Sequence, residues 1–292
     1  MRAALRSTFV KVAVIVLAVG GLLVGSVQVA GAATAPSTGF NDWSCRPSAT
    51  HPDPVVALHG LGGNGPGNYA FLGPSLASAG YCVFAPTYGQ PVSSIPVGGL
   101  VSIADSASQV TAFIDQVLST TGAAKVDIVG HSEGGFLSLY VPKVSGYAGK
   151  VDRVVALAPP THGTNFANLV TLADLLGVHP VVDQLLNTFG CQACSELITG
   201  GSAVATLTNG PIAQPGVSYT IIASQADELV TPHQTSFVAE PGVHNAFVQD
   251  TCPLDPVGHI GLAFDGGVAD MVRNALDPAN AKPVNCGLGL PF

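Results

Sequence analysis

The stretch Lys125-Val-Asp-Ile-Val-Gly-His-Ser-Glu-Gly-Gly-Phe-Leu-Ser-Leu-Tyr140 decides how the rest of the chain is interpreted. It begins as a short apolar run and ends in a helical pattern, with Gly130-His131-Ser132-Glu133-Gly134 between them. This order predicts a strand, a sharp turn with a serine at its apex, and a helix. Glycines two residues to either side suit such a turn, because strand and helix nearly touch there and leave no room for Cβ atoms. The serine is a candidate nucleophile; the alternative is a glycine-rich turn with a serine near a helix N-cap.

Strand and helix patterns alternate along the rest of the chain. Short apolar runs predict further strands at 54–60, 81–85, 151–158, 219–223 and 246–249. Helical patterns lie at 69–79, 102–121 and 260–276, and residues 161–215 interrupt the alternation with apolar pieces and a helical piece near 195–207. The alternation predicts an α/β fold with a mostly parallel central sheet flanked by helices. We expect one domain over residues 33–292, with 161–215 as a helical cap or lid insertion.

Residues 1–32 have the pattern of a secretory signal peptide. A basic start precedes an apolar segment, and Ala30-Gly31-Ala32 offers small residues for cleavage just after Ala32 or Ala33. The alternative is an uncleaved membrane anchor, which the two glycines inside the apolar segment disfavour. We therefore expect a secreted protein, cleaved near Ala32.

The chain is sparse in charge and acidic. Charged residues make up 10% of its 292 positions and hydrophobic residues 47%. Since three of the 10 basic residues lie in the signal segment, the mature chain keeps seven basic against 18 acidic residues. This balance, with no basic patch, excludes nucleic acid as an expected partner. The sequence leaves the oligomeric state open.

Six cysteines follow the signal segment: Cys45, Cys82, Cys191, Cys194, Cys252 and Cys286. An even number in an exported chain predicts three disulfides, with 15 possible connectivities. We interpret Cys191-Gln-Ala-Cys194 as a local disulfide rather than half of a zinc site, because zinc needs about four ligands and no second pair lies nearby. No metal site is evident and no cofactor is expected, while carboxylates scattered in the loops leave a structural calcium open.

A serine nucleophile needs a base, a carboxylate that orients the base, and N–H donors for an oxyanion. In elbow-type hydrolases the order along the chain is Ser, acid, His, each after a later strand. Three histidines follow the candidate acids. His259 lies in the loop after the last predicted strand, whereas His233 lies at a presumed helix start and His244 leads into a strand. We therefore expect His259 to be the base rather than a surface histidine.

The candidate acids are Asp227 and Glu228, just after the strand predicted at 219–223. Asp227 is preferred, because its shorter side chain suits a fixed hydrogen bond to an imidazole. The alternative is that Asp227 only caps the following turn. Asp250 and Asp255 are weaker rivals.

The oxyanion donors are expected to be the backbone N–H groups of Glu133 and Leu61. Glu133 follows the candidate nucleophile, and Leu61 lies in a glycine-rich loop after the first strand. Glycines at 60, 62 and 63 would let that backbone approach a ligand closely. Three further histidines in these loops are expected to brace them rather than to catalyse: His59, His131 and His162.

Together these segments resemble the secreted class 2 lipases of actinobacterial type, which are α/β-hydrolases, and more distantly yeast lipase B. The resemblance covers most of residues 41–278 in order. It is carried by Asp42-Trp-Ser-Cys-Arg-Pro-Ser48, His51-Pro-Asp-Pro-Val-Val-Ala-Leu-His-Gly60, Gly80-Tyr-Cys-Val-Phe84, Lys125 to Ser132, Lys150-Val-Asp-Arg153 with Ala156-Leu-Ala-Pro159, Asp227-Glu-Leu-Val-Thr-Pro232, and Cys252-Pro-Leu-Asp255 with His259.

The resemblance implies a Ser132–Asp227–His259 triad and oxyanion donors at Leu61 and Glu133. It implies hydrolysis of carboxylic esters of medium- or long-chain fatty acids, of the triacylglycerol type, with a lipid or ester substrate that can lie at a lipid–water interface. It also implies the disulfides Cys45–Cys82, Cys191–Cys194 and Cys252–Cys286. Apolar, nearly uncharged pieces at 165–190 would then form a lid or acyl-binding wall, or simply pack as a cap.

One residue departs from the family pattern. Glutamine often follows the nucleophile in such lipases, and here the residue is Glu133. A carboxylate suits a helix N-terminus, but it would repel a developing oxyanion if it faced the acyl site. Three other functions stay open for the same residues: a soluble carboxylesterase or polyester hydrolase, a secreted acyltransferase, and a catalytically inactive binding protein.

Overall fold

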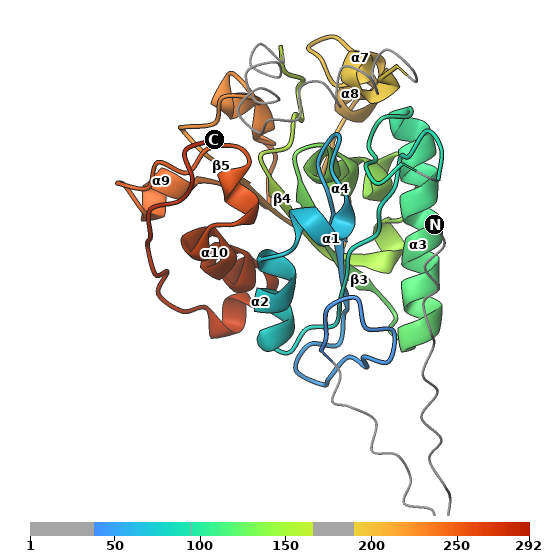
Figure 1. Ribbon diagram of the computed structural model, residues 1–292, viewed down its shortest axis with the longest axis vertical. Helices are drawn as coiled ribbons and strands as arrows, with labels where there is room; N and C mark the ends of the chain where they lie inside the picture. The colour runs from blue at the N-terminus through green and yellow to red at the C-terminus, as the bar shows by residue number, and fades with distance from the viewer. Residues whose placement is uncertain (1–37, 94, 166–189) are drawn as a thin grey trace, which may run out of the picture. The chain divides into compact units, whose positions relative to one another are not determined.

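The computed structural model describes residues 38–93, 95–165 and 190–292 (Figure 1). These residues build a six-stranded sheet of order β2-β1-β3-β4-β5-β6, in which every neighbouring pair is parallel. The strands are β1 (Val55–Leu58), β2 (Val83–Phe84), β3 (Val126–His131), β4 (Val151–Leu157), β5 (Ser218–Ala223) and β6 (Val243–Phe247). Strands β1 and β3 are buried along their whole length, as parallel strands covered on both faces are.

The last predicted strand was misplaced. Residues 246–249 were expected to form it, but β6 covers 243–247 and Val248–Thr251 form the short helix α9. Asp250 explains the difference, because its Oδ2 accepts the backbone N–H of Phe247 and closes a helical turn.

The helices in the described residues are α1 (Gly65–Asn68), α2 (Leu72–Ser78), α3 (Ile103–Thr121), α4 (Glu133–Lys143), α7 (Gln192–Glu196), α8 (Ser202–Thr208), α9 and α10 (Gly266–Leu276). Helix α3 matches its prediction: Ser102 Oγ accepts the Asp105 N–H at one end, and Gly122 ends the helix with φ 76°. The predicted helix at 195–207 is two helices, because Gly200 adopts φ 82° between them. The predicted helix at 260–276 likewise divides into a short 3-10 turn (Gly261–Ala263) and α10, which Asp265 caps.

Apolar side chains cover both faces of the sheet. Val56 and Leu58 of β1 join one cluster with α3, α4 and α8, and Val55 and Ala57 join the other with α2 and α10. This alternation follows from the two-residue period of a strand. Figure 1 shows α3 on one side of the sheet and α2 and α10 on the other.

The six cysteines form the three disulfides that the resemblance implies: Cys45–Cys82, Cys191–Cys194 and Cys252–Cys286. The sulfurs of Cys191 and Cys194 are therefore not available as zinc ligands. Three disulfides are compatible with an extracellular protein.

Two predicted segments lie outside the described residues. They are the signal peptide at 1–32 and the centre of the cap at 166–189. Within the described ranges, no helix combines the length and the apolar character that crossing a bilayer requires.

Candidate active site

Ser132 lies at the tight turn between β3 and α4. Its backbone has φ 58° and ψ −118°, a region that residues with a side chain rarely adopt. A Cβ at Gly130 would lie 2.1 Å from the carbonyl oxygen of Gly134, and a Cβ at Gly134 would lie 2.0 Å from that of Leu58. Both positions therefore require glycine. From residue 126 to 142, Ser132 is the one residue that is not buried, so the turn presents this hydroxyl to solvent.

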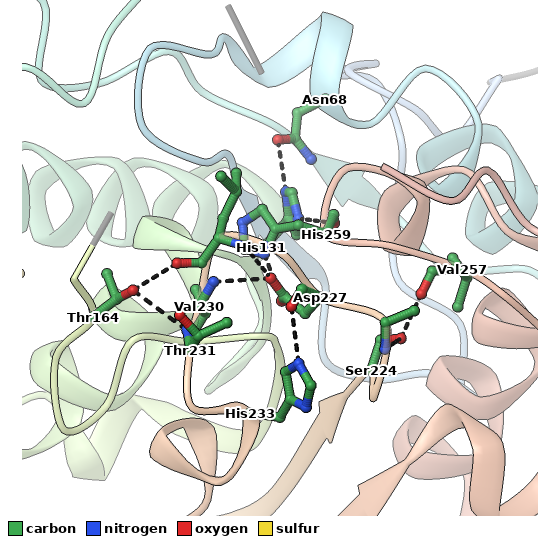
Figure 2. Close-up of polar contacts among 12 residues, drawn as sticks. Asn68, His131, Thr164, Ser224, Asp227, Val230, Thr231, His233, Val257 and His259 are labelled. Carbon is green, nitrogen blue, oxygen red and sulfur yellow. Dashed lines mark hydrogen bonds and ion pairs between the residues drawn. The ribbon is translucent and has the colours of Figure 1, made fainter. Parts of the chain in front are cut away.

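Asp227 and His259 form a buried pair. Asp227 follows β5 and His259 follows β6 and α9, and their side chains meet with His259 Nδ1 2.7 Å from Asp227 Oδ2. The other oxygen, Asp227 Oδ1, accepts the N–H groups of Leu229 and Val230, both at 2.8 Å. Each side of the pair is 3% exposed. Figure 2 shows Asp227 with His259 and Val230 beside it.

Electrostatics keep Asp227 ionised. Burial alone would raise the pKa of its carboxyl, but the charge and hydrogen bond of His259 and the two backbone N–H groups outweigh burial and lower the pKa. An ionised Asp227 that accepts from Nδ1 fixes the tautomer of His259, so that Nε2 is free to take a proton.

The nucleophile turn and the His259 loop are in contact. His131, the residue before Ser132, donates from Nε2 to the carbonyl oxygen of His259 at 2.9 Å, and the two rings lie 5.0 Å apart between centroids. The loop after β1 approaches from another side, because a Cβ at Gly60 would lie 3.1 Å from Ser132 Cβ. The structure thus brings three predicted loops to one place, although Ser132 Oγ makes no hydrogen bond to any described residue.

The rival residues have other positions. His233 donates to the backbone carbonyl of Asp227 at 2.9 Å (Figure 2), and His244 lies exposed in β6. Asp255 accepts the backbone N–H groups of Val257 and Gly289, Asp250 closes the turn described above, and Glu228 is exposed.

The glycine-rich loop after β1 is held by backbone hydrogen bonds. Gly62 donates to the carbonyl of Gly98 at 2.9 Å, and Gly98 donates to that of Gly63 at 2.7 Å. Leu61 N–H has no acceptor among the described residues. Glu133 is the first residue of α4, so its N–H has no intrahelical acceptor, and no side chain caps the helix.

Asn68 and the last residues of the chain support the site in a way that the sequence did not predict. Asn68 Oδ1 accepts the Gly60 N–H at 3.1 Å and lies 3.1 Å from His131 Nδ1. Gly258 donates to the carbonyl of Leu290, and Gly261 donates to that of Phe292, on either side of His259. These contacts join distant parts of the chain, so no local sequence pattern predicts them.

The three other loop histidines contact backbone. His59 donates from Nδ1 to Gly60 O and stacks on Tyr88 with 4.2 Å between ring centroids. Burial lowers the pKa of His59 to about 4 and that of His131 to about 3, so both rings are neutral at pH 7. His162 lies 3.0 Å from the carbonyl oxygen of Thr235.

Glu133 is the unusual residue. Its side chain is fully buried, and neither carboxyl oxygen has a hydrogen-bond partner among the described residues. Oε2 lies against Gly99, where a Cβ would come within 2.5 Å of it. Burial first, and then the negative charge of Glu196, raise the pKa of Glu133 well above its ordinary value. A neutral carboxylic acid here removes the repulsion that an anion would impose on a nearby oxyanion.

Comparisons with known proteins agree with this architecture. A family model described as the alpha/beta hydrolase fold matches residues 53–184. Over 112 residues, or 36% of this chain, the sequence is 36% identical to a triacylglycerol lipase of Pseudarthrobacter phenanthrenivorans and to one of Burkholderia plantarii. The chain covers 34% and 30% of those two proteins, about a third of their length.

Solved structures extend the likeness beyond that segment. Aspergillus fumigatus lipase B aligns with a TM-score of 0.58 and 19% identity, over 87% of this chain and 66% of that one. A serine hydrolase from a Cycloclasticus bacterium aligns with a TM-score of 0.53 and 17% identity, over 79% and 92%. Its parallel sheet, its strand-to-helix turn and these likenesses show that the chain has an α/β-hydrolase fold.

Proposed function

We propose that this protein is a secreted lipase or esterase that hydrolyses carboxylic esters of medium- to long-chain fatty acids. The observation that carries the proposal is the buried Asp227–His259 pair, which lies beside the turn that presents Ser132. The names of the two triacylglycerol lipases support an ester substrate.

The proposed reaction is acyl transfer in two steps. Ser132 Oγ attacks the ester carbonyl while His259 Nε2 takes the hydroxyl proton, and Asp227 stabilises the imidazolium that forms. The alcohol leaves with that proton. Water then attacks the acyl-enzyme, again with His259 as the base, and releases the fatty acid.

The N–H groups of Leu61 and Glu133 are the proposed oxyanion donors. Both have no acceptor among the described residues, and both belong to backbone that is already fixed, by the Gly62–Gly98 and Gly98–Gly63 hydrogen bonds and by α4. Donors fixed before the reaction cost no reorganisation when the charge develops.

We also propose that residues 1–32 are removed on export, which the three disulfides support. Residues 33–292 then form one domain, with 161–215 as its cap. The apolar pieces of that cap favour long acyl chains and action at a lipid–water interface.

The test is a chain-length series of esters, from acetate to oleate, with the purified mature protein and Ser132→Ala. We expect turnover to rise toward longer chains and Ser132→Ala to lose it. Preference for acetate would identify a soluble esterase or polyester hydrolase, and transfer to an added alcohol faster than to water would identify an acyltransferase. Failure of a fluorophosphonate to label Ser132, read by mass spectrometry, would refute the serine mechanism.

A further inference from the structure

Three carboxylates gather at the amino ends of the central strands, at the opposite end of the sheet from the candidate active site. Asp53 precedes β1, Asp127 is the second residue of β3, and Asp152 is the second residue of β4. One oxygen from each lies within 4.8 Å of the others. We name these three residues the aspartate cluster.

An irregularity in the sheet contributes to this arrangement. Val126 pairs with Val151 and Ile128 pairs with Val154, so Asp127 alone faces two residues of β4, Asp152 and Arg153. Such a bulge re-aims side chains at a sheet end. The bulge thus places a carboxylate of β4 beside that of β3.

One oxygen of the Asp127 side chain lacks a hydrogen-bond partner. Its side chain is 4% exposed, and its Oδ1 accepts no hydrogen bond from any described residue. A buried polar atom without a partner is costly and calls for a ligand, an ion or a water to satisfy it.

A cavity opens at the cluster. It has a volume of about 180 Å³, and its lining combines the three aspartates with Thr50, His51, Pro52, Tyr81, Arg153, Leu276 and Asp277. Since one water occupies roughly 30 Å³ in the liquid, the cavity has room for a cation that keeps several waters.

We propose that the aspartate cluster binds one divalent cation of the hard, oxygen-preferring kind, with calcium as the best fit. Calcium takes six to eight oxygen ligands in flexible geometry, which three carboxylates and several waters can supply. Two cations already lie near: Lys125 Nζ is 3.5 Å from Asp152 Oδ1, and Arg153 Nε is 3.6 Å from Asp152 Oδ2. Both engage Asp152, and neither provides a hydrogen bond to Asp127 Oδ1.

The charges within the cluster agree with a bound cation. Burial, then the negative charges of Asp53 and Asp152, raise the pKa of Asp127, and Arg153 opposes them through its charge and its backbone N–H. A cation bound among the three carboxylates would offset their mutual repulsion.

The test is calcium titration of the chelator-treated mature protein by calorimetry, up to about 10 mM, ten times the weak end of extracellular calcium sites. We expect one site and a higher Tm with calcium. Asp127→Asn should bind at least about tenfold more weakly, because a ligand with negative charge is lost. Asp115→Asn is the matched control: it removes an exposed carboxylate from the Lys150 ion pair and should bind like the parent.

Asp53→Asn is the second variant, since it leaves the buried position intact and should also weaken binding. Absence of one-to-one binding by calcium, magnesium or manganese would overturn the proposal. Unchanged affinity in both Asp53→Asn and Asp127→Asn would overturn it as well. Ester turnover does not enter the readout, so the result is independent of the proposed function.

Discussion

Replacing Glu133 with glutamine tests the electrostatics of the candidate site most directly. The change keeps the size of the side chain and replaces its ionisable carboxyl with a neutral amide. In the folded protein the carboxyl is fully buried without a partner, and its pKa lies well above the ordinary 4.5. In the unfolded chain the same carboxyl loses its proton near pH 4.5.

The sign and the magnitude follow from linkage. Below pH 4.5 both states are protonated, and the stability of the folded state is unaffected. As pH rises from there toward the raised folded pKa, only the unfolded state gains by ionising, so the parent protein loses about 1.4 kcal/mol of stability per pH unit. The loss accumulates over the whole range between the two pKa values. Glu133→Gln has no ionisable group at this position, so its stability does not fall with pH in this way.

The assay is urea unfolding of parent and Glu133→Gln between pH 5 and pH 7, without reductant. Glutamine adds a buried amide that costs about 1–3 kcal/mol at every pH, so the informative quantity is the slope of the difference against pH. Asp115→Asn is the control and should show no such slope, because the hydrogen bond from Lys150 holds the pKa of Asp115 below its ordinary 3.8, outside this pH range. Parallel curves for the parent and Glu133→Gln would refute the reasoning, because they would mean that Glu133 ionises normally in the folded state.

The remaining predictions concern the proposed catalytic groups and their supports. Asp227→Asn should lower kcat for esters by about 10⁴-fold, because the amide allows the wrong His259 tautomer; a loss below tenfold in steady-state kinetics would contradict the assignment. Gly134→Ala should prevent folding or lower Tm sharply, since its Cβ would lie 2.0 Å from Leu58 O, whereas Gly149→Ala meets nothing within 4 Å and should melt like the parent. Replacing Cys252 and Cys286 with alanine should destabilise the fold by about 2–4 kcal/mol. It should also reduce ester turnover, because the segment after Cys286 holds the backbone around His259.

The parts of the candidate site that depend on local sequence and on strand order could be predicted. The glycines at 130 and 134 predict the tight turn. A Cβ at Gly130 would meet Gly134 O within the turn itself, and a Cβ at Gly134 would meet Leu58 O at the end of the neighbouring strand. The position of His259 followed from its place after the last strand. His259 lies at the expected edge of the sheet although the last strand was misplaced, because the α/β alternation fixes which loops reach the same edge.

Features that depend on long-range packing could not be predicted. Nothing near Asn68 in the sequence indicates that it would contact both Gly60 and His131. The state of Glu133 depends on Gly99 and Glu196, which come from a loop and from α7. The aspartate cluster could not be predicted either, because its members come from three separate elements and share no spacing. The sequence left a structural calcium open but indicated no ligands for it.

The two ends of β3 connect the aspartate cluster to the candidate active site. Holding Ser132 at φ 58° costs of order 1–3 kcal/mol, which the surrounding structure must balance. The buried residues of β3 and α4 supply that support. At the other end of β3, Oδ1 of Asp127 lacks a hydrogen-bond partner among the described residues. A cation bound there would tie the starts of β1, β3 and β4 together without touching any group that reacts. Its removal should therefore lower the temperature at which ester turnover is lost, while kcat at 25 °C stays the same.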